Sequence, residues 1–369
     1  MLGEINFKSV VDGMLIDARV YLLFIFIYII CFFFMLKSDG LSKKNPLINK
    51  SSPAEIISLS FLSLGLFLVG LVETGWAEFF FGVKGNDVEL SAFLGISVWA
   101  ALVLFSLSYK AKKLSRTGIL VSLFIIGSFL LFGARSYAAI LLLTFVLLRS
   151  DFEKKYAAKD LGLVIGMAVC VFLFASFKLF YKVLKSSSLE LIFSNLADQE
   201  IEVYYTLILA DPLAVIYNLN LVVYHEKTLH LGYLVHRVVS IIPFFGGVIS
   251  EINNGEYLRF SDILKNEFHN VPWGLASTFI GELLALIGYS GTLIVLFLWI
   301  FLIYVFNTFL SGSFTFFGRA MIPALIYAIF YIHRVDITFV LGAVKTTLVV
   351  FLFVALSTSI LKRRLSLRK

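Results

Sequence analysis

Long apolar runs separated by short polar segments recur along this chain of 369 residues. A helix that crosses a hydrocarbon core of about 30 Å needs about 20 residues. We predict nine transmembrane helices, at 16–36, 56–73, 91–109, 117–133, 136–149, 161–184, 277–309, 314–333 and 337–361. Outer-membrane barrel strands would instead alternate polar and apolar residues over roughly ten positions. The chain is therefore predicted to be an all-α polytopic membrane protein.

The composition agrees with this prediction. Hydrophobic residues make up 60% of the chain and charged residues 15%, whereas soluble domains average about 45–50% and about 25%. Such an excess excludes a soluble enzyme, a disordered chain and a disulfide-rich secreted scaffold. Cys31 and Cys170 both lie inside apolar runs, which favours helix packing over a disulfide.

Basic residues near the ends of the predicted helices set the orientation. The segments 37–55, 110–116, 149–160 and 311–319 and the tail from Lys362 hold 18 of the 31 basic residues but only 5 of the 24 acidic ones. This side is predicted to be cytoplasmic. The net charge of +7 therefore reflects membrane topology rather than nucleic-acid binding. With nine helices, the N-terminus is expected on the outer side.

One large external segment, 185–276, interrupts an otherwise single domain that covers 1–369. Long connections of this kind are usually functional. Its part 201–224 is apolar enough to resemble a tenth crossing, but Asp211 and Pro212 stand in its middle. A tenth crossing would also turn the basic tail outward. We predict re-entrant or interfacial helices broken at the proline.

Three arginines depart from the charge pattern, because they lie on the outer side next to apolar elements: Arg135, Arg237 and Arg334. Lys345 follows Arg334 by eleven residues, which places both on one helical face. Ionisable groups at membrane depth are costly and are functional candidates. The alternatives are that Arg135 reaches lipid head groups and that Asp336 pairs with Arg334.

Arg135 opens a helix of about 14 residues, or about 21 Å, which is too short to cross the membrane. The tip of this hairpin is therefore expected to lie below the outer surface, where it would hold a cation in a cavity. Several cations in one membrane pocket suit a multivalent anion, because arginine binds phosphate oxygens through two parallel hydrogen bonds. Fixed arginines would also stabilise the charge that develops on a diphosphate leaving group, without a metal.

A metal site is not expected. The histidines at 225, 230 and 236 do not have the i, i+4 spacing of a zinc-binding helix, and the outer side has no cysteine.

The chain resembles the O-antigen (oligosaccharide repeat unit) polymerases, Wzy, of bacterial inner membranes. Three stretches carry the resemblance, together with Arg334 at the outer start of the last helix. They are Gly133-Ala-Arg135-Ser, the large loop with Arg237 before Pro243, and the run 277–291 with Gly281-Glu282 and Gly288-Tyr-Ser-Gly291.

The resemblance implies a membrane glycosyltransferase of the C type that faces the periplasm and needs no metal or cofactor. Such an enzyme transfers a growing glycan from undecaprenyl diphosphate to the non-reducing end of another undecaprenyl-linked repeat unit, in lipopolysaccharide biosynthesis. Arg135, Arg237 and Arg334 would hold diphosphates, with Lys345 as a further cation. The segment 185–276 would cap the sugar cleft. A protein that regulates chain length would be a further partner, in addition to membrane lipid.

A general base is needed to deprotonate the acceptor hydroxyl. The candidates are His236, Glu282 and Asp336. Glu282 has a second interpretation, because an acidic residue in the first turn of a helix complements the helix dipole.

Three other functions remain open. An O-antigen ligase, which joins polymer to lipid A core, would share fold and arginines, but the run 277–291 favours the polymerase. A transporter or flippase of an anionic glycolipid would use the same cations, although no internal repeat is visible. A metal-dependent glycosyltransferase would need an acidic pair, such as Asp87 with Glu89 or Glu200 with Glu202.

Overall fold

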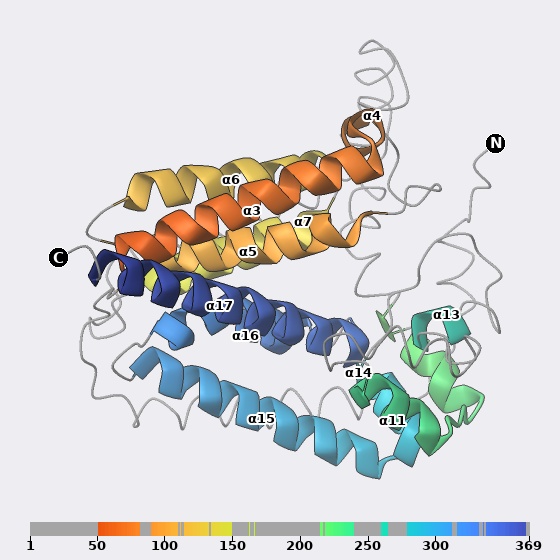
Figure 1. Ribbon diagram of the computed structural model, residues 1–369. Helices are drawn as coiled ribbons and strands as arrows, with labels where there is room; N and C mark the ends of the chain where they lie inside the picture. The colour runs from red at the N-terminus through yellow and green to blue at the C-terminus, as the bar shows by residue number, and fades with distance from the viewer. Residues whose placement is uncertain are drawn as a thin grey trace. The chain divides into compact units, whose positions relative to one another are not determined.

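We describe a computed structural model of the chain. It describes residues 51–81, 90–109, 111, 114–132, 134–149, 162, 166, 215–216, 218–239, 260–264, 279–311, 316–331, 335 and 337–366. Almost all of these residues are helical, and none of them forms a strand. The chain is thus all-α over its described part (Figure 1). The predicted helices at 16–36 and, apart from residues 162 and 166, at 161–184 lie outside that part.

The chain divides into two compact units. We call residues 1–41, 188–300 and 332–338 the loop unit, and residues 42–187, 301–331 and 339–369 the bundle unit. Each is described by itself below.

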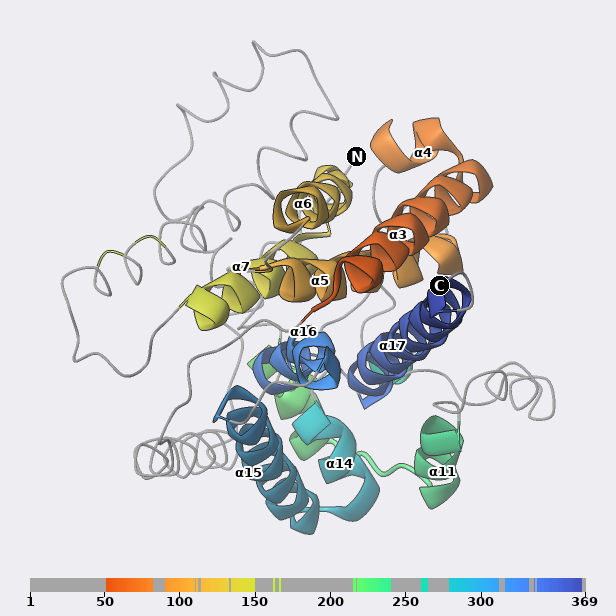
Figure 2. The same cartoon turned by 60° about the vertical axis from the view of Figure 1, so that its left-hand side comes forward.

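The bundle unit is a set of apolar helices. They are α3 (Pro53–Thr74), α4 (Trp76–Phe81), α5 (Ala92–Ser108), α6 (Ser115–Leu131), α7 (Arg135–Arg149), the second half of α15 (Ser290–Ser311), α16 (Phe316–Tyr331) and most of α17 (Ile337–Ser366). Figures 1 and 2 show α3, α5 and α6 running side by side, and these helices are in contact. α3 begins with a capping box between Ser52 and Glu55, followed by Pro53 in its first turn.

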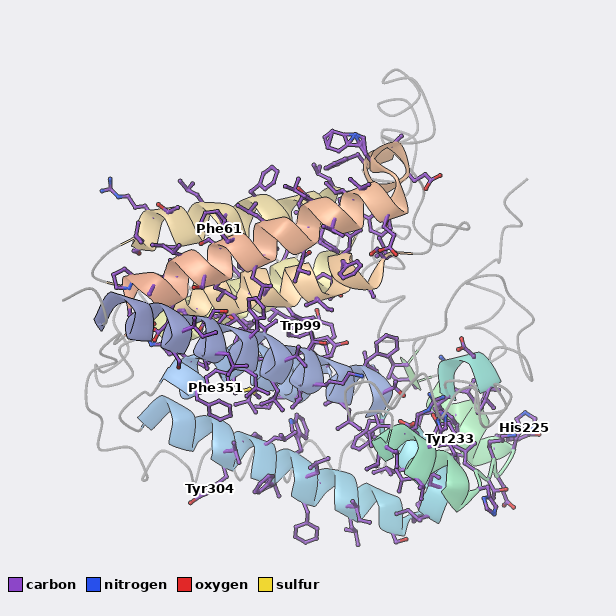
Figure 3. All side chains as sticks on the ribbon, viewed as in Figure 1. Phe61, Trp99, His225, Tyr233, Tyr304 and Phe351 are labelled. Atoms are coloured by element: carbon purple, nitrogen blue, oxygen red, sulfur yellow. The ribbon has the colours of Figure 1, made fainter. Side chains whose placement is uncertain are left out.

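Aromatic rings join the helices of this unit. The ring of Phe79 in α4 lies 5.4 Å from that of Phe129 in α6 and 5.9 Å from that of Phe67 in α3. The ring of Trp99 in α5, labelled in Figure 3, lies 5.5 Å from that of Tyr327 in α16. Edge-to-face contacts of this kind add to the energy of burial.

Glycine residues allow two pairs of helices to approach each other closely. A Cβ atom at Gly70 would lie 2.6 Å from Leu94 Cγ, where α3 meets α5. At Gly118 it would lie 2.8 Å from the Cβ of Ser108, where α6 meets α5. Helices of a membrane protein commonly use small residues to approach each other closely.

Two helices are long and apolar enough to span a membrane: Pro53–Thr74 and Ile337–Ile360. Only 33% and 22% of their apolar windows are buried, so neither is an enclosed core helix. Exposed side chains on them include Phe61, Val72 and Leu356, at 75%, 84% and 65%. Further apolar helices of 10–17 residues lie within α5, α6, α7, α15 and α16.

The loop unit contains α11 (Leu231–Val239), α13 (Phe260–Leu264), α14 (Phe279–Ile287) and the start of α15 (Ser290–Ser311), together with the first residues of α17. Helical residues also occur at 215–216 and 218–224. The predicted short helix around Arg237 is present as α11. Pro212 and Pro243, where breaks were predicted, lie outside the described residues.

One prediction from the sequence needs correction. The expected continuous helix at 277–309 is wrong, because Gly288 adopts a φ of +66° and separates α14 from α15.

Arg319, which belongs to the basic segment 311–319, is 2% exposed within α16. Its Nη1 donates to the carbonyl oxygen of Tyr109 at 3.0 Å, near the end of α5. The last carbonyl groups of a helix have no hydrogen-bond donor within that helix, and a cationic side chain at this end can supply one.

Candidate functional site

Glu282 lies in the first turn of α14 and is fully buried. Its Oε1 accepts a hydrogen bond from the hydroxyl of Tyr233 at 2.7 Å, and its Oε2 accepts one from the backbone N–H of Ile337 at 2.7 Å. A buried carboxylate is costly unless hydrogen bonds compensate it. These bonds therefore explain how an acid is tolerated here, and they join three segments of the loop unit.

Ile337 is the first residue of α17. The first N–H groups of a helix have no partner within that helix. A carboxylate placed at a helix N-terminus satisfies one of them and also complements the helix dipole. Glu282 thus stabilises the start of α17 from another helix.

Tyr233 lies in α11 and is 2% exposed. Burial, and then the charge of Glu282, raise the pKa of Tyr233 above its usual value of 10. The hydroxyl therefore stays protonated at neutral pH and remains a donor to Glu282. Figure 3 shows Tyr233 within the group of side chains around α11 and α14.

Arg237 follows Tyr233 by one helical turn and is 6% exposed. Its Cζ lies 4.8 Å from the centroid of the Tyr233 ring. This distance is within the range of a cation–π interaction, which is strongest where water is excluded. The chain thus places a buried guanidinium on an aromatic face.

His236 precedes Arg237 in the last turn of α11 and is half-buried. Burial, and then the positive charge of Arg237, lower the pKa of His236 from 6.5. The imidazole is therefore neutral at pH 7. A neutral imidazole is the form that accepts a proton.

A shallow groove of about 300 Å³ lies beside this cluster. One wall is the C-terminal half of α14 with Tyr289, and the other is Val222, Val223 and residues 226–228. The backbone N–H of Leu229 donates to the carbonyl oxygen of Ala285 at 2.7 Å and holds the walls together. Apolar side chains form most of the lining, and Glu226, Lys227 and Thr228 add polar groups.

The structure links Arg237 and Glu282 through Tyr233 in the loop unit, and His236 precedes Arg237 in the same helix. Arg334 and Asp336 lie outside the described residues, as does the side chain of Arg135, which begins α7. Lys345 belongs to the bundle unit, and its side chain is half-buried. In the part of the chain that the structure describes, no three His, Cys, Asp or Glu side chains form a group suited to a metal ion.

Sequence reasoning missed two members of this cluster, Tyr233 and the backbone N–H of Ile337. The spacing of Tyr233 and Arg237 is the i, i+4 spacing of neighbours on a helix, and it was the available signal. No local pattern indicated that these two groups contact Glu282, because it lies 49 residues from Tyr233 and 55 from Ile337.

Comparisons of the chain with protein-family models, with curated proteins and with solved structures give no match.

Proposed function

We propose that this protein is a polytopic membrane glycosyltransferase that polymerises lipid-linked oligosaccharide repeat units on the outer face of a bacterial inner membrane. The donor is a glycan on undecaprenyl diphosphate, and the acceptor is a sugar hydroxyl of a second lipid-linked unit. The nine-helix topology with 185–276 outside belongs to this proposal. So does the C-type glycosyltransferase fold.

The observation that carries the proposal is the buried cluster of Arg237, Tyr233 and Glu282 at the start of α17. A guanidinium that is 6% exposed suits an anion that enters a site away from bulk water, because such charge interactions strengthen where the dielectric is low. A diphosphate leaving group is an anion of this kind, and its charge increases as the glycosidic bond breaks.

Arg334 strengthens the proposal through the sequence. It stands three residues before Ile337 in the sequence, and arginine is suited to two-point binding of phosphate oxygens. Arg135 and Lys345 remain further candidates for diphosphate binding.

His236 is the favoured general base among the three candidates. Its neutral form predominates at pH 7, and it adjoins Arg237. Glu282 is fully buried and already accepts two hydrogen bonds, so we assign it the role of holding the cluster together. Asp336 remains a candidate.

The test begins with deletion of the gene in the source bacterium and a lipopolysaccharide gel. The polymerase predicts core that carries a single repeat unit and no ladder. Bare core with accumulated lipid-linked polymer would indicate a ligase instead. An unchanged ladder would contradict both, and transport of intact glycolipid by the protein in liposomes would indicate a flippase.

Complementation then tests the site. Arg237→Ala should restore no ladder although the protein reaches the membrane in normal amount. Arg237→Lys should restore a partial ladder, because lysine keeps the charge but not the planar, two-point recognition of phosphate. Arg116→Ala is the matched control, since Arg116 is exposed on α6, and it should restore the full ladder.

A further inference from the structure

We propose that Tyr233 is a positioning residue for Arg237: it holds the guanidinium on its ring, in the orientation that binds a diphosphate, and Glu282 fixes the ring in turn. This inference rests on the proposed function and names a residue through which the same site acts.

The first argument concerns freedom of movement. A free arginine side chain carries about 2 kcal/mol of rotamer entropy, and part of this is lost each time it binds a ligand. The ring of Tyr233 lies 4.8 Å from the guanidinium carbon and restricts it before any ligand arrives. Restricting a binding group in advance raises affinity by reducing the cost of ordering it.

The second argument is that the ring is itself held. Tyr233 is 2% exposed, and its hydroxyl donates to Glu282 Oε1 at 2.7 Å. The other carboxylate oxygen is engaged by Ile337 at 2.7 Å. The aromatic platform is therefore attached to α14 and to the start of α17 as well as to its own helix.

The third argument concerns geometry. The contact of Arg237 with the ring of Tyr233 is a cation–π interaction, which does not require the N–H donors of the guanidinium. A guanidinium has five such donors, and they are the groups that pair with phosphate oxygens. An arginine held on an aromatic ring can thus still bind an anion.

The experiment uses the full chain in lipid nanodiscs, with inorganic diphosphate as the probe and calorimetry as the measurement. Tyr233→Phe keeps the ring but loses the hydrogen bond, and diphosphate affinity should fall about threefold. Tyr233→Leu removes the ring as well, and the affinity should fall about tenfold. Arg237→Ala should lose most of the binding.

A double-mutant cycle separates positioning from general destabilisation. In the Arg237→Ala background, Tyr233→Leu should cause no further loss of affinity, because its effect acts through the arginine. Thermal unfolding of each variant shows whether it is folded. Tyr304→Phe and Tyr304→Leu are matched controls at a tyrosine of α15 that is 61% exposed and lies in the bundle unit, and both should bind diphosphate as the unmodified protein does.

The outcomes distinguish the two proposals. If the unmodified protein does not bind diphosphate, or Arg237→Ala binds it equally well, the proposed diphosphate site is wrong. If Arg237 is required but both Tyr233 variants bind as the unmodified protein does, only the positioning role is wrong. Equal losses from Tyr233→Leu with and without Arg237 would also overturn that role.

Discussion

The carboxylate of Glu282 accepts the backbone N–H of Ile337 at 2.7 Å, so the last helix of the chain is capped by a side chain 55 residues earlier. In the bundle unit, Arg319 donates to the carbonyl oxygen of Tyr109 near the end of α5, across 210 residues. In both places a buried charge satisfies the backbone at the end of another helix. Charges are tolerated inside a protein when they are hydrogen-bonded in this way.

Replacement of Glu282 by glutamine should destabilise the loop unit. Glutamine has one side-chain oxygen in place of two, so either the hydroxyl proton of Tyr233 or the N–H of Ile337 loses its acceptor. An unsatisfied buried donor costs about 1–3 kcal/mol. The free energy of unfolding in detergent micelles measures this loss. Glu226→Gln, at an exposed acid of the same unit, should have no effect. Equal stability of the two variants would contradict the capping role.

The enzymatic activity should persist somewhat below pH 6.5, because His236, the favoured general base, stays neutral there. Burial and Arg237 lower the pKa of His236, so the neutral base persists to a lower pH than in a free peptide. The acid limb of the rate–pH profile is therefore expected below pH 6.5. His236→Gln should reduce the rate by about 10²- to 10⁴-fold and remove that limb. A variant that keeps both the rate and the limb would show that another group is the base.

The same shift in pKa links His236 to stability. The unfolded chain binds the proton more tightly than the folded chain, so stability should fall as the pH drops from 6.5 through the lowered pKa. The free energy of unfolding of the His236→Gln variant should therefore depend less on pH between 6.5 and the lowered pKa than that of the unmodified protein.

Arg319→Met should destabilise the bundle unit. The substitution removes the charged donor of a hydrogen bond, and the carbonyl oxygen of Tyr109 loses that donor. The expected loss in the free energy of unfolding is about 1–3 kcal/mol. The midpoint of thermal unfolding measures the effect. Arg116→Met is the matched control, at an exposed arginine of α6, and should change the midpoint little. A midpoint for Arg319→Met equal to that of the control would refute the capping interpretation.

Gly118→Ala should destabilise the contact between α5 and α6. The added Cβ would overlap Ser108 Oγ and approach Ser108 Cβ to 2.8 Å, and overpacking of this kind costs about 1–3 kcal/mol. Gly127→Ala in the same helix meets nothing within 4 Å and should stabilise by up to about 1 kcal/mol through helix propensity. Thermal unfolding compares the two. Ser108→Gly should restore part of the stability that Gly118→Ala loses, and failure to do so would place the strain elsewhere.

Gly288→Ala should destabilise the turn between α14 and α15. Nothing lies within 4 Å of the added Cβ, so the cost comes from the φ of +66° and is about 1–2 kcal/mol. Gly288→Asn should cost less, because asparagine tolerates this region better. Gly342→Ala, in open space within α17, serves as a control and should stabilise. A stable Gly288→Ala variant would indicate that α14 and α15 can join as one helix.

Several helices could be predicted from the sequence because the signal is local. The predicted segments at 56–73, 91–109 and 117–133 correspond to α3, α5 and α6 within a few residues. The break at Gly288 was not predicted, because glycine also occurs inside apolar helices and a positive φ leaves no pattern in the sequence. The burial of Arg319 was not predicted either, because it depends on a contact between α16 and the end of α5, 210 residues away.

The residues of the candidate site could also be predicted only in part. The sequence by itself singled out Arg237, His236 and Glu282, because charged residues beside apolar runs are conspicuous wherever they occur. The tertiary structure alone decided that Tyr233 lies between Arg237 and Glu282, and that Glu282 caps the helix beginning at Ile337. These contacts join residues about 50 positions apart, and a local pattern carries no information on which distant groups meet when helices pack.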